Sequence, residues 1–139
     1  MLKNIPNCIS PELLKILDEM GHGDFIVIAD ANFPGSSLNN KVIRADGVKG
    51  KEMLEAVLRL INLDTYSDTN FILMETTNND PTPGIWDEYL NIANIYDTNV
   101  KNSFLSRLDF YEKAKKAYAI IQTGETTSYA NIILQKGVI

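Results

Sequence analysis

The sequence predicts an α/β fold: one compact domain over residues 1–139, with a central mixed, largely parallel sheet flanked by helices. Segments with helical spacing alternate with short apolar segments through most of the chain. Segment 25–29 is apolar at every position, which is typical of a central strand covered by helices on both faces. A length of 139 residues is enough for one domain with a substantial hydrophobic core.

The first half of the chain alternates helical and extended patterns. Ser10 can cap the first helix, Pro11 suits its first position, and Gly21 ends it after apolar residues at helical spacing. Segment 32–40 carries turn residues without periodicity and predicts a loop. The expected helices of this half are 11–20 and 50–61, and the expected strands are 25–29, 41–45 and 71–74.

The second half continues this alternation after a loop over 76–84, which is rich in Asn, Asp, Thr and Pro. Trp86 lies at helical spacing with other apolar residues, which favours the core over a platform for stacking a sugar ring. Arg107 comes just before the last expected helix, where a surface position or an ion pair with Asp109 or Glu112 is the ordinary explanation. The expected helices are 85–93 and 108–114, and the expected strands are 117–122 and 129–134.

The composition excludes several classes of protein. A formal net charge of −5 argues against nucleic acid or an anionic membrane as the partner. One cysteine and one histidine allow no intrachain disulfide and no usual zinc constellation. No apolar run approaches the ~20 residues of a membrane span, and the first residues lack the apolar core of a signal peptide. The expectation is therefore a cytoplasmic protein.

The only histidine, His22, lies between two glycines in a turn directly before the apolar strand 25–29. Histidine exchanges protons near neutral pH, and flanking glycines let the backbone approach a ligand closely. Asp30 follows the carboxyl end of the same strand, so the two side chains are candidate site residues. The plainer alternative is that Gly21 caps the helix and His22 is a polar turn residue. A dyad of His22 with Cys8 is conceivable, although an inert structural cysteine is favoured.

Five motifs, in order, resemble one known family. They are Met-Gly-His-Gly-Asp at 20–24, Asp-Ala-Asn-Phe-Pro at 30–34, Val-Ile-Arg-Ala-Asp-Gly at 42–47, Phe-Tyr-Glu-Lys-Ala at 110–114, and Thr-Gly-Glu at 123–125 with Tyr-Ala-Asn-Ile-Ile-Leu at 129–134. Together they are similar to the L-fucose mutarotase branch of the D-ribose pyranase/L-fucose mutarotase family. The resemblance extends over nearly the whole chain, from Leu2 to Gly137.

This resemblance implies an enzyme that interconverts the α and β anomers of a reducing sugar, L-fucose in the first place, without a metal or another cofactor. By family pattern His22 matches the catalytic histidine. The residues that match substrate contacts are Asp30, Arg107, Tyr129, Ala130 and Asn131. The family also implies a ring-like homo-oligomer, expected to be a decamer, with pockets completed across subunit contacts. No nucleic acid and no membrane are expected as partners.

The chemistry fits these residue types. Mutarotation needs one group to take the proton of the anomeric hydroxyl and another to protonate the ring oxygen. His22 can serve as one of them, and Asp30, Tyr118, Tyr129 or a bound water remain open as the other. Arg107 offers a planar set of donors for sugar oxygens, and the Asn131 amide can donate and accept at neighbouring hydroxyls.

Two departures from the family pattern leave the sugar open. Ser36 stands two residues after Phe-Pro, where the family often has histidine, and Asn32 precedes Phe-Pro, where histidine is also frequent. The ranking among L-fucose, D-galactose and D-ribose therefore stays open. The alternatives to an L-fucose mutarotase are a D-ribose pyranase-type enzyme and a non-catalytic sugar-binding regulatory protein.

Overall fold

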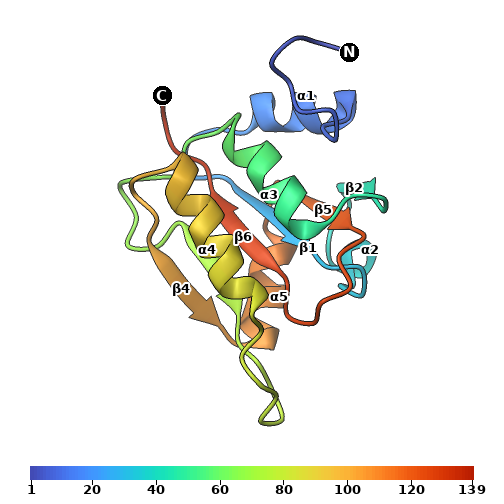
Figure 1. Cartoon of the computed structure of the whole chain (residues 1–139), viewed down its shortest axis with the longest axis vertical. Coiled ribbons are helices and arrows are strands. Elements are labelled where there is room, and N and C mark those ends of the chain that lie inside the picture. Colours follow the sequence, from blue (N-terminus) through green and yellow to red (C-terminus); the bar gives the residue numbers. More distant parts are fainter.

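A computed structural model describes all residues, 1–139, and confirms the predicted α/β class: a six-stranded mixed sheet flanked by helices (Figure 1). Both termini lie at the same end of the molecule. None of the helices is both long and apolar enough to cross a membrane. The elements are α1 (Pro11–Glu19), β1 (Phe25–Ala29), α2 (Gly35–Leu38), β2 (Val42–Ala45), α3 (Gly50–Leu58), β3 (Phe71–Met74), α4 (Ile85–Tyr96), β4 (Asn102–Leu105), α5 (Arg107–Lys115), β5 (Ala119–Thr123) and β6 (Ile132–Gln135).

The strands follow the order β2-β5-β1-β6-β3-β4 across the sheet. Pairs β2·β5, β5·β1 and β3·β4 are parallel, whereas β6 runs antiparallel to both of its neighbours, β1 and β3. Five strands therefore point the same way and only β6 is reversed. As a result, the segments that follow β1 and β4 and the segment that precedes β6 all lie at one edge of the sheet.

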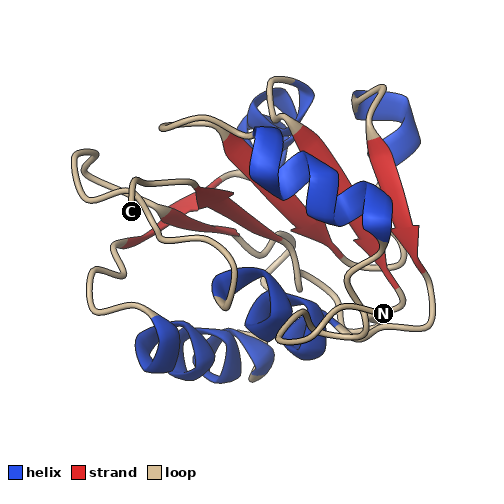
Figure 2. Cartoon of the chain, turned by 90° about the horizontal axis from the view of Figure 1, so that it is seen from above, coloured by secondary structure: helices blue, strands red, loops and turns tan.

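Alternate residues of the central strands face two separate hydrophobic clusters, one on each side of the sheet. Ile26 and Ile28 of β1 pack with apolar residues of α1, α3 and α4. Val27 and Ala29 of the same strand pack on the opposite face, with Phe110 of α5. Figure 2 shows helices on both faces of the sheet. Because both faces are covered, β1 is apolar throughout, as its sequence predicts.

The first helix begins where the sequence predicts, since the Ser10 hydroxyl accepts a hydrogen bond from the Leu13 amide at 3.1 Å. At its other end the Lys136 ammonium donates to the carbonyls of Leu17 and Met20 at 2.7 and 2.6 Å. A cation placed there stabilises the free carbonyls and the negative end of the helix dipole. The turn that carries His22 is therefore tied to the end of β6.

Three details correct the sequence prediction. The segment 32–40, expected as a loop, contains the short helix α2. Strand β4 was not anticipated, because as an edge strand it alternates between exposed and half-buried residues and has no apolar run. The expected strand 129–134 begins only at Ile132, and Tyr129 has a positive φ of 58°, which no regular strand residue adopts.

Gly124 is needed for a close approach between the turn after β5 and the segment after β2. A Cβ atom at this position would lie 1.9 Å from the Asp46 carbonyl oxygen, whereas a Cβ at Gly47 would meet nothing within 4 Å. We expect Gly124→Ala to lower the free energy of unfolding by roughly 1–3 kcal/mol, because the backbone must move apart. Chemical denaturation measures the change, and Gly47→Ala is the control. Equal stability of the two variants would contradict this account.

Candidate functional site

One edge of the sheet brings together four of the residues that the sequence singled out. Asp30 follows β1, Arg107 follows β4, and Tyr129 and Asn131 precede the reversed strand β6. In open α/β sheets, ligands bind at this edge, beyond the carboxyl ends of the parallel strands. All four line one cavity of about 220 Å³, whose other lining residues are Asn32, Phe33, Met74, Asp80, Tyr111 and Ser128.

The floor of this cavity is a buried pair, Asp30 and Asn131. The Asn131 amide donates to the Asp30 carboxylate at 2.9 Å, and the Asn131 carbonyl oxygen accepts from the Asp30 backbone amide at 2.7 Å. The Asn32 amide also donates to the Asp30 carboxylate, at 2.9 Å. Burial raises the pKa of Asp30, and the hydrogen bonds from Asn32 and Asn131 oppose that rise. These hydrogen bonds fix the Asp30 carboxylate, an acceptor, and the Asn131 amide in the lining of the cavity.

The Tyr129 hydroxyl is held between two residues of the long loop that precedes α4. It donates to the Asp80 carboxylate at 2.5 Å, and it accepts from the Thr77 backbone amide at 3.2 Å. The backbone of Tyr129 is fixed as well, because the Trp86 indole N–H donates to its carbonyl at 2.9 Å. This contact holds the residue in its left-handed conformation. The cavity wall formed by Tyr129 is therefore held by hydrogen bonds within the chain.

Arg107 is the exposed cation of the cavity. It is the first residue of α5, where the Ser106 hydroxyl caps the helix by accepting from the Asp109 amide at 3.2 Å. Its guanidinium lies 5.9 Å from the centre of the Tyr111 ring and forms no ion pair within the chain. The ion pair with Asp109 or Glu112 considered from the sequence is absent, so the guanidinium donors are available to a ligand.

Ala130 and Tyr118, which the sequence also predicted as site residues, do not line this cavity. Ala130 is buried, and its carbonyl accepts from the Tyr89 hydroxyl at 3.2 Å, so the residue joins the cavity wall to α4. Tyr118 lies outside the cavity: its hydroxyl donates to Glu19 at 3.1 Å, and it borders a different hollow, beside Asp24 and Lys41. Tyr118 therefore cannot be the second acid/base group of a site built around Asp30 within one chain.

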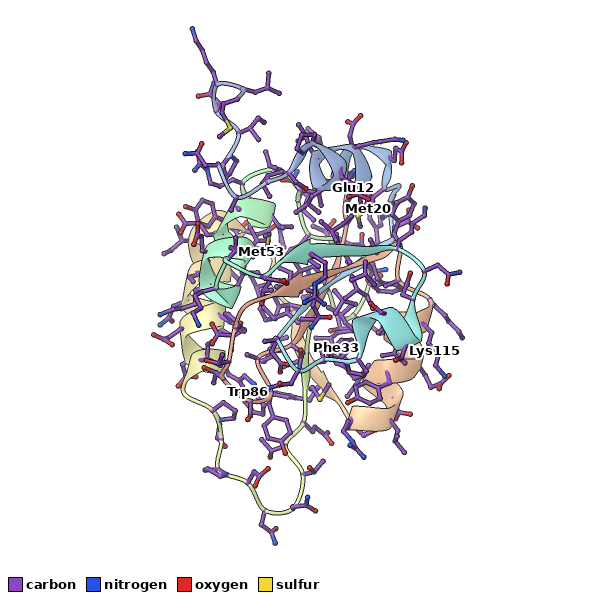
Figure 3. The ribbon with its side chains drawn as sticks, turned by 90° about the vertical axis from the view of Figure 1, so that its right-hand side faces the viewer. Glu12, Met20, Phe33, Met53, Trp86 and Lys115 are labelled. Carbon is purple, nitrogen blue, oxygen red and sulfur yellow. The ribbon has the colours of Figure 1, made fainter.

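His22 does not lie in this cavity either. His22 precedes β1, whereas Asp30 follows that strand, and its five residues at about 3.3 Å each put roughly 16 Å of strand between them. In Figure 3 the labelled Met20, two residues before His22, lies above Phe33, three residues after Asp30. Within one chain the predicted histidine and carboxylate cannot contact the same sugar ring.

His22 has a partner at its own end of the sheet. Its Nε2 atom lies 2.8 Å from Oδ1 of Asp64, and its ring centre lies 5.3 Å from that of Tyr66. The His22 side chain remains 45% exposed, whereas that of Asp64 is 2% exposed. The Ser67 hydroxyl and the His22 imidazole hold the pKa of Asp64 well below its usual range, even though burial works in the opposite direction. Asp64 is thus an ionised, buried carboxylate beside an accessible imidazole.

Cys8 takes no part in either group of residues. Its thiol is half-buried beside α3, and burial followed by the Glu52 carboxylate raises its pKa. The low thiol pKa that its place before a helix start would suggest is therefore absent. Cys8 borders a hollow of about 490 Å³ between residues 4–8 and α3, which none of the predicted site residues lines.

The sequence did not identify Asp64 or Asp80 as site residues. Asp64 stands in an Asp-Thr-Tyr-Ser segment, a typical turn composition in which the carboxylate accepts from the amides two and three residues later. That local signal was available, but its contact with His22 spans 42 residues and depends on how β6 crosses the sheet. Asp80 has no signal beyond its place in a polar loop.

Comparisons with known proteins match the chain over nearly its full length. A family model described as the RbsD / FucU transport protein family matches residues 3–139. An L-fucose mutarotase of Histophilus somni is 46% identical, and the aligned part is 99% of this chain and 97% of the relative. A crystal structure of the fucose mutarotase of Streptococcus pneumoniae in complex with L-fucose has a TM-score of 0.95 and 51% identity over 99% of both chains. The structure of Bacillus subtilis RbsD complexed with D-ribose has a TM-score of 0.77 and 27% identity, over 94% of this chain and 95% of that one.

Proposed function

The chain belongs to the RbsD / FucU transport protein family, and from that membership we propose that it is an L-fucose mutarotase. It is an isomerase that interconverts the α and β anomers of L-fucose, and residues 1–139 form one mutarotase domain. The single observation that carries the proposal is the similarity, at about half of all positions and along the whole chain, to a fucose mutarotase in complex with L-fucose. We propose that the enzyme acts in the cytoplasm.

The cavity at the sheet edge supports this function by its size and donor set. About 220 Å³ suits one small polar molecule such as a monosaccharide. The Asp30 carboxylate accepts hydrogen bonds from sugar hydroxyls, the Arg107 guanidinium donates to sugar oxygens, and Asn131 aligns Asp30 from below. Tyr129 offers a ring edge and a hydroxyl held by Asp80. Asp30, Arg107, Tyr129, Ala130 and Asn131 are therefore proposed to bind the substrate.

The reaction is a proton-balanced opening and closing of a hemiacetal. A base takes the proton of the anomeric hydroxyl while an acid protonates the ring oxygen, and the bond between C1 and the ring oxygen breaks. The products are an aldehyde at C1 and a hydroxyl at the former ring position. Rotation about the C1–C2 bond exposes the other carbonyl face, and the reverse proton transfers close the ring. We assign one of these transfers to His22, because histidine is the side chain that most often serves in general acid–base catalysis.

Because His22 and the cavity lie at opposite ends of β1, the site requires a second copy of the chain. We propose that His22 of one protomer completes the cavity of its neighbour in a homo-oligomer, a decamer by the family pattern. Two exposed apolar side chains support contact near the cavity: Leu108 beside Arg107 is 67% exposed and Phe104 in β4 is 42% exposed. Tyr66, beside His22, is 78% exposed, so the other end of the contact is also open.

One of the two residues that depart from the family pattern lines the cavity. It is Asn32, whereas Ser36 lies exposed on α2. An amide at position 32 can donate and accept without titrating, so it binds sugar oxygens but does not exchange protons near neutral pH. The D-ribose complex of the RbsD relative keeps ribose ring interconversion as the second candidate function.

The test is saturation-transfer NMR on equilibrated sugars with purified protein. We expect transfer between the α- and β-anomeric proton signals of L-fucose that rises with protein concentration, and weaker transfer with D-ribose and D-galactose. Transfer confined to ribose ring forms would establish the pyranase alternative. Saturable L-fucose binding without transfer would establish a non-catalytic binding protein.

A further inference from the structure

Asp64 is the most heavily hydrogen-bonded carboxylate outside the sugar cavity. Its Oδ1 accepts from His22 Nε2 at 2.8 Å and from the Tyr66 amide at 3.1 Å. Its Oδ2 accepts from the Ser67 amide at 3.2 Å and from the Ser67 hydroxyl at 2.6 Å. The side chain is 2% exposed, so every acceptor position is used inside the protein and none is left for solvent.

We propose that Asp64 is a positioning residue, which fixes the orientation and the tautomer of His22 for proton transfer. This inference rests on the proposed function, because it gives His22 its role. Asp64 does not contact the sugar in this scheme. It acts through the imidazole, as a buried carboxylate does when it holds a histidine that works as base and acid.

The two partners are fixed to the same stretch of backbone, the end of β6. The Asp64 amide donates to the Gln135 carbonyl at 3.0 Å, and the Gly23 amide donates to the Lys136 carbonyl at 2.8 Å. The Lys136 amide in turn donates to the Asp24 carbonyl at 2.9 Å. The turn with His22 and the turn with Asp64 are therefore attached to consecutive residues. This arrangement fixes their distance without a contact from another protomer.

Gly23 completes this arrangement. It has a φ of +86°, a conformation that L side chains rarely adopt, and it lets the turn close directly after the histidine. The Asp24 carboxylate accepts from the Gly21 amide at 2.8 Å, which closes the other side of the turn. The two glycines noted in the sequence thus serve to place the imidazole against Asp64.

The contact determines which imidazole nitrogen carries the hydrogen in the neutral form. An ionised carboxylate only accepts, so Nε2 must be the donor, and Nδ1 is left with its lone pair. Within the chain the His22 side chain makes no other hydrogen bond, and it is 45% exposed. Nδ1 is therefore the atom that takes the sugar proton. The Tyr66 ring lies beside the imidazole, with the two ring centres 5.3 Å apart.

The experiment uses the fact that His22 is the only histidine. In protein labelled with ¹⁵N-histidine, the two imidazole nitrogens give a single set of signals. At a pH where the ring is neutral, we expect the wild-type spectrum to show hydrogen on Nε2 and a lone pair on Nδ1, with the Nε2 proton protected from exchange. In Asp64→Asn we expect that protection to be lost.

The kinetic part measures anomer exchange of L-fucose by the wild type and Asp64→Asn. We expect kcat to fall by at least about tenfold and by no more than the roughly 10²–10⁴-fold that general acid–base catalysis by one group supplies. KM should change by less than about threefold. KM changes little because the proposed sugar contacts lie in the cavity at the other edge. Ser67→Ala is the matched control, since it removes the 2.6 Å hydrogen bond from the same turn but leaves the carboxylate on His22.

The outcomes separate this inference from the proposed function. Hydrogen on Nδ1 in the wild type would overturn the inference, as would a folded, assembled Asp64→Asn protein with unchanged kcat. A loss of activity in Ser67→Ala as large as that in Asp64→Asn would assign the effect to the turn and overturn it too. If the wild type exchanges no sugar, the proposed function fails, and the spectra still report whether Asp64 holds the imidazole.

Discussion

Replacing His22 with alanine is expected to lower the catalysed rate of L-fucose anomer exchange by about 10²–10⁴-fold, the usual contribution of one positioned acid/base group. The fold should survive, because the His22 side chain is 45% exposed and makes a single hydrogen bond. The measurement is saturation transfer between the two anomeric protons, at matched protein concentration and with the spontaneous exchange rate subtracted.

The same variant should retain most of its affinity for the sugar. Asp30, Arg107 and Tyr129 bind the substrate in the proposed site, and they belong to a cavity that His22 of the same chain does not reach. Titration calorimetry with L-fucose tests this. His22→Gln is the control, because glutamine can donate and accept hydrogen bonds but cannot exchange protons near neutral pH. Full activity of either variant would remove His22 from the mechanism.

The sequence predicted the elements whose burial requires a regular pattern of apolar residues or whose ends carry capping residues. Strand β1 was predicted at its observed bounds, because a strand covered on both faces must be apolar at every position. The start of α1 was also predicted, since Ser10 and Pro11 carry local capping chemistry. Strand β4 was missed because this edge strand has no apolar run: exposed residues alternate with half-buried ones, and even Phe104, which packs at a tilt against Trp86, is exposed.

The site was predictable only in part, because a single sequence shows neither the direction of a strand nor the contacts between distant segments. Asp30 lies where the chain leaves a central strand, which is a topological rule that the sequence can supply. The contact between His22 and Asp64 depends on the reversed strand β6, whose direction no local pattern reveals. The conformation of Tyr129 depends on the Trp86 indole 43 residues away.

The distance between His22 and the cavity bears on how the protein assembles. Motifs that match a family identify the site residues, but they do not show whether those residues meet within one chain or between two. Because His22 precedes β1 and Asp30 follows it, the two residues can share a site only if two chains assemble, as the proposed function requires. In the proposed function, one protomer of 15.6 kDa therefore contributes to two sites and completes neither alone.

An equimolar mixture of His22→Ala and Asp30→Asn, assembled together from unfolded chains, is therefore expected to regain activity that neither variant has alone. A site that takes its histidine from one protomer and its carboxylate from the next is intact in roughly one quarter of random pairings. A site built within one chain would be intact in none. Exchange NMR gives the activity, and light scattering checks that the mixture assembles as the wild type does.

The choice of variants makes this complementation specific. Asp30→Asn mixed with Arg107→Ala should stay inactive, because both changes fall in one cavity and no pairing of protomers repairs it. His22→Ala mixed with Asp64→Asn should gain no activity beyond that of the two variants alone, because both changes fall at the other end of β1 and no pairing restores an intact His22 and Asp64 together. Activity in the first mixture but not in these two would assign every tested residue to one of two halves. A first mixture that stays inactive while assembling normally would mean that each chain works with its own histidine, and the geometry around β1 would then have to change on binding the sugar.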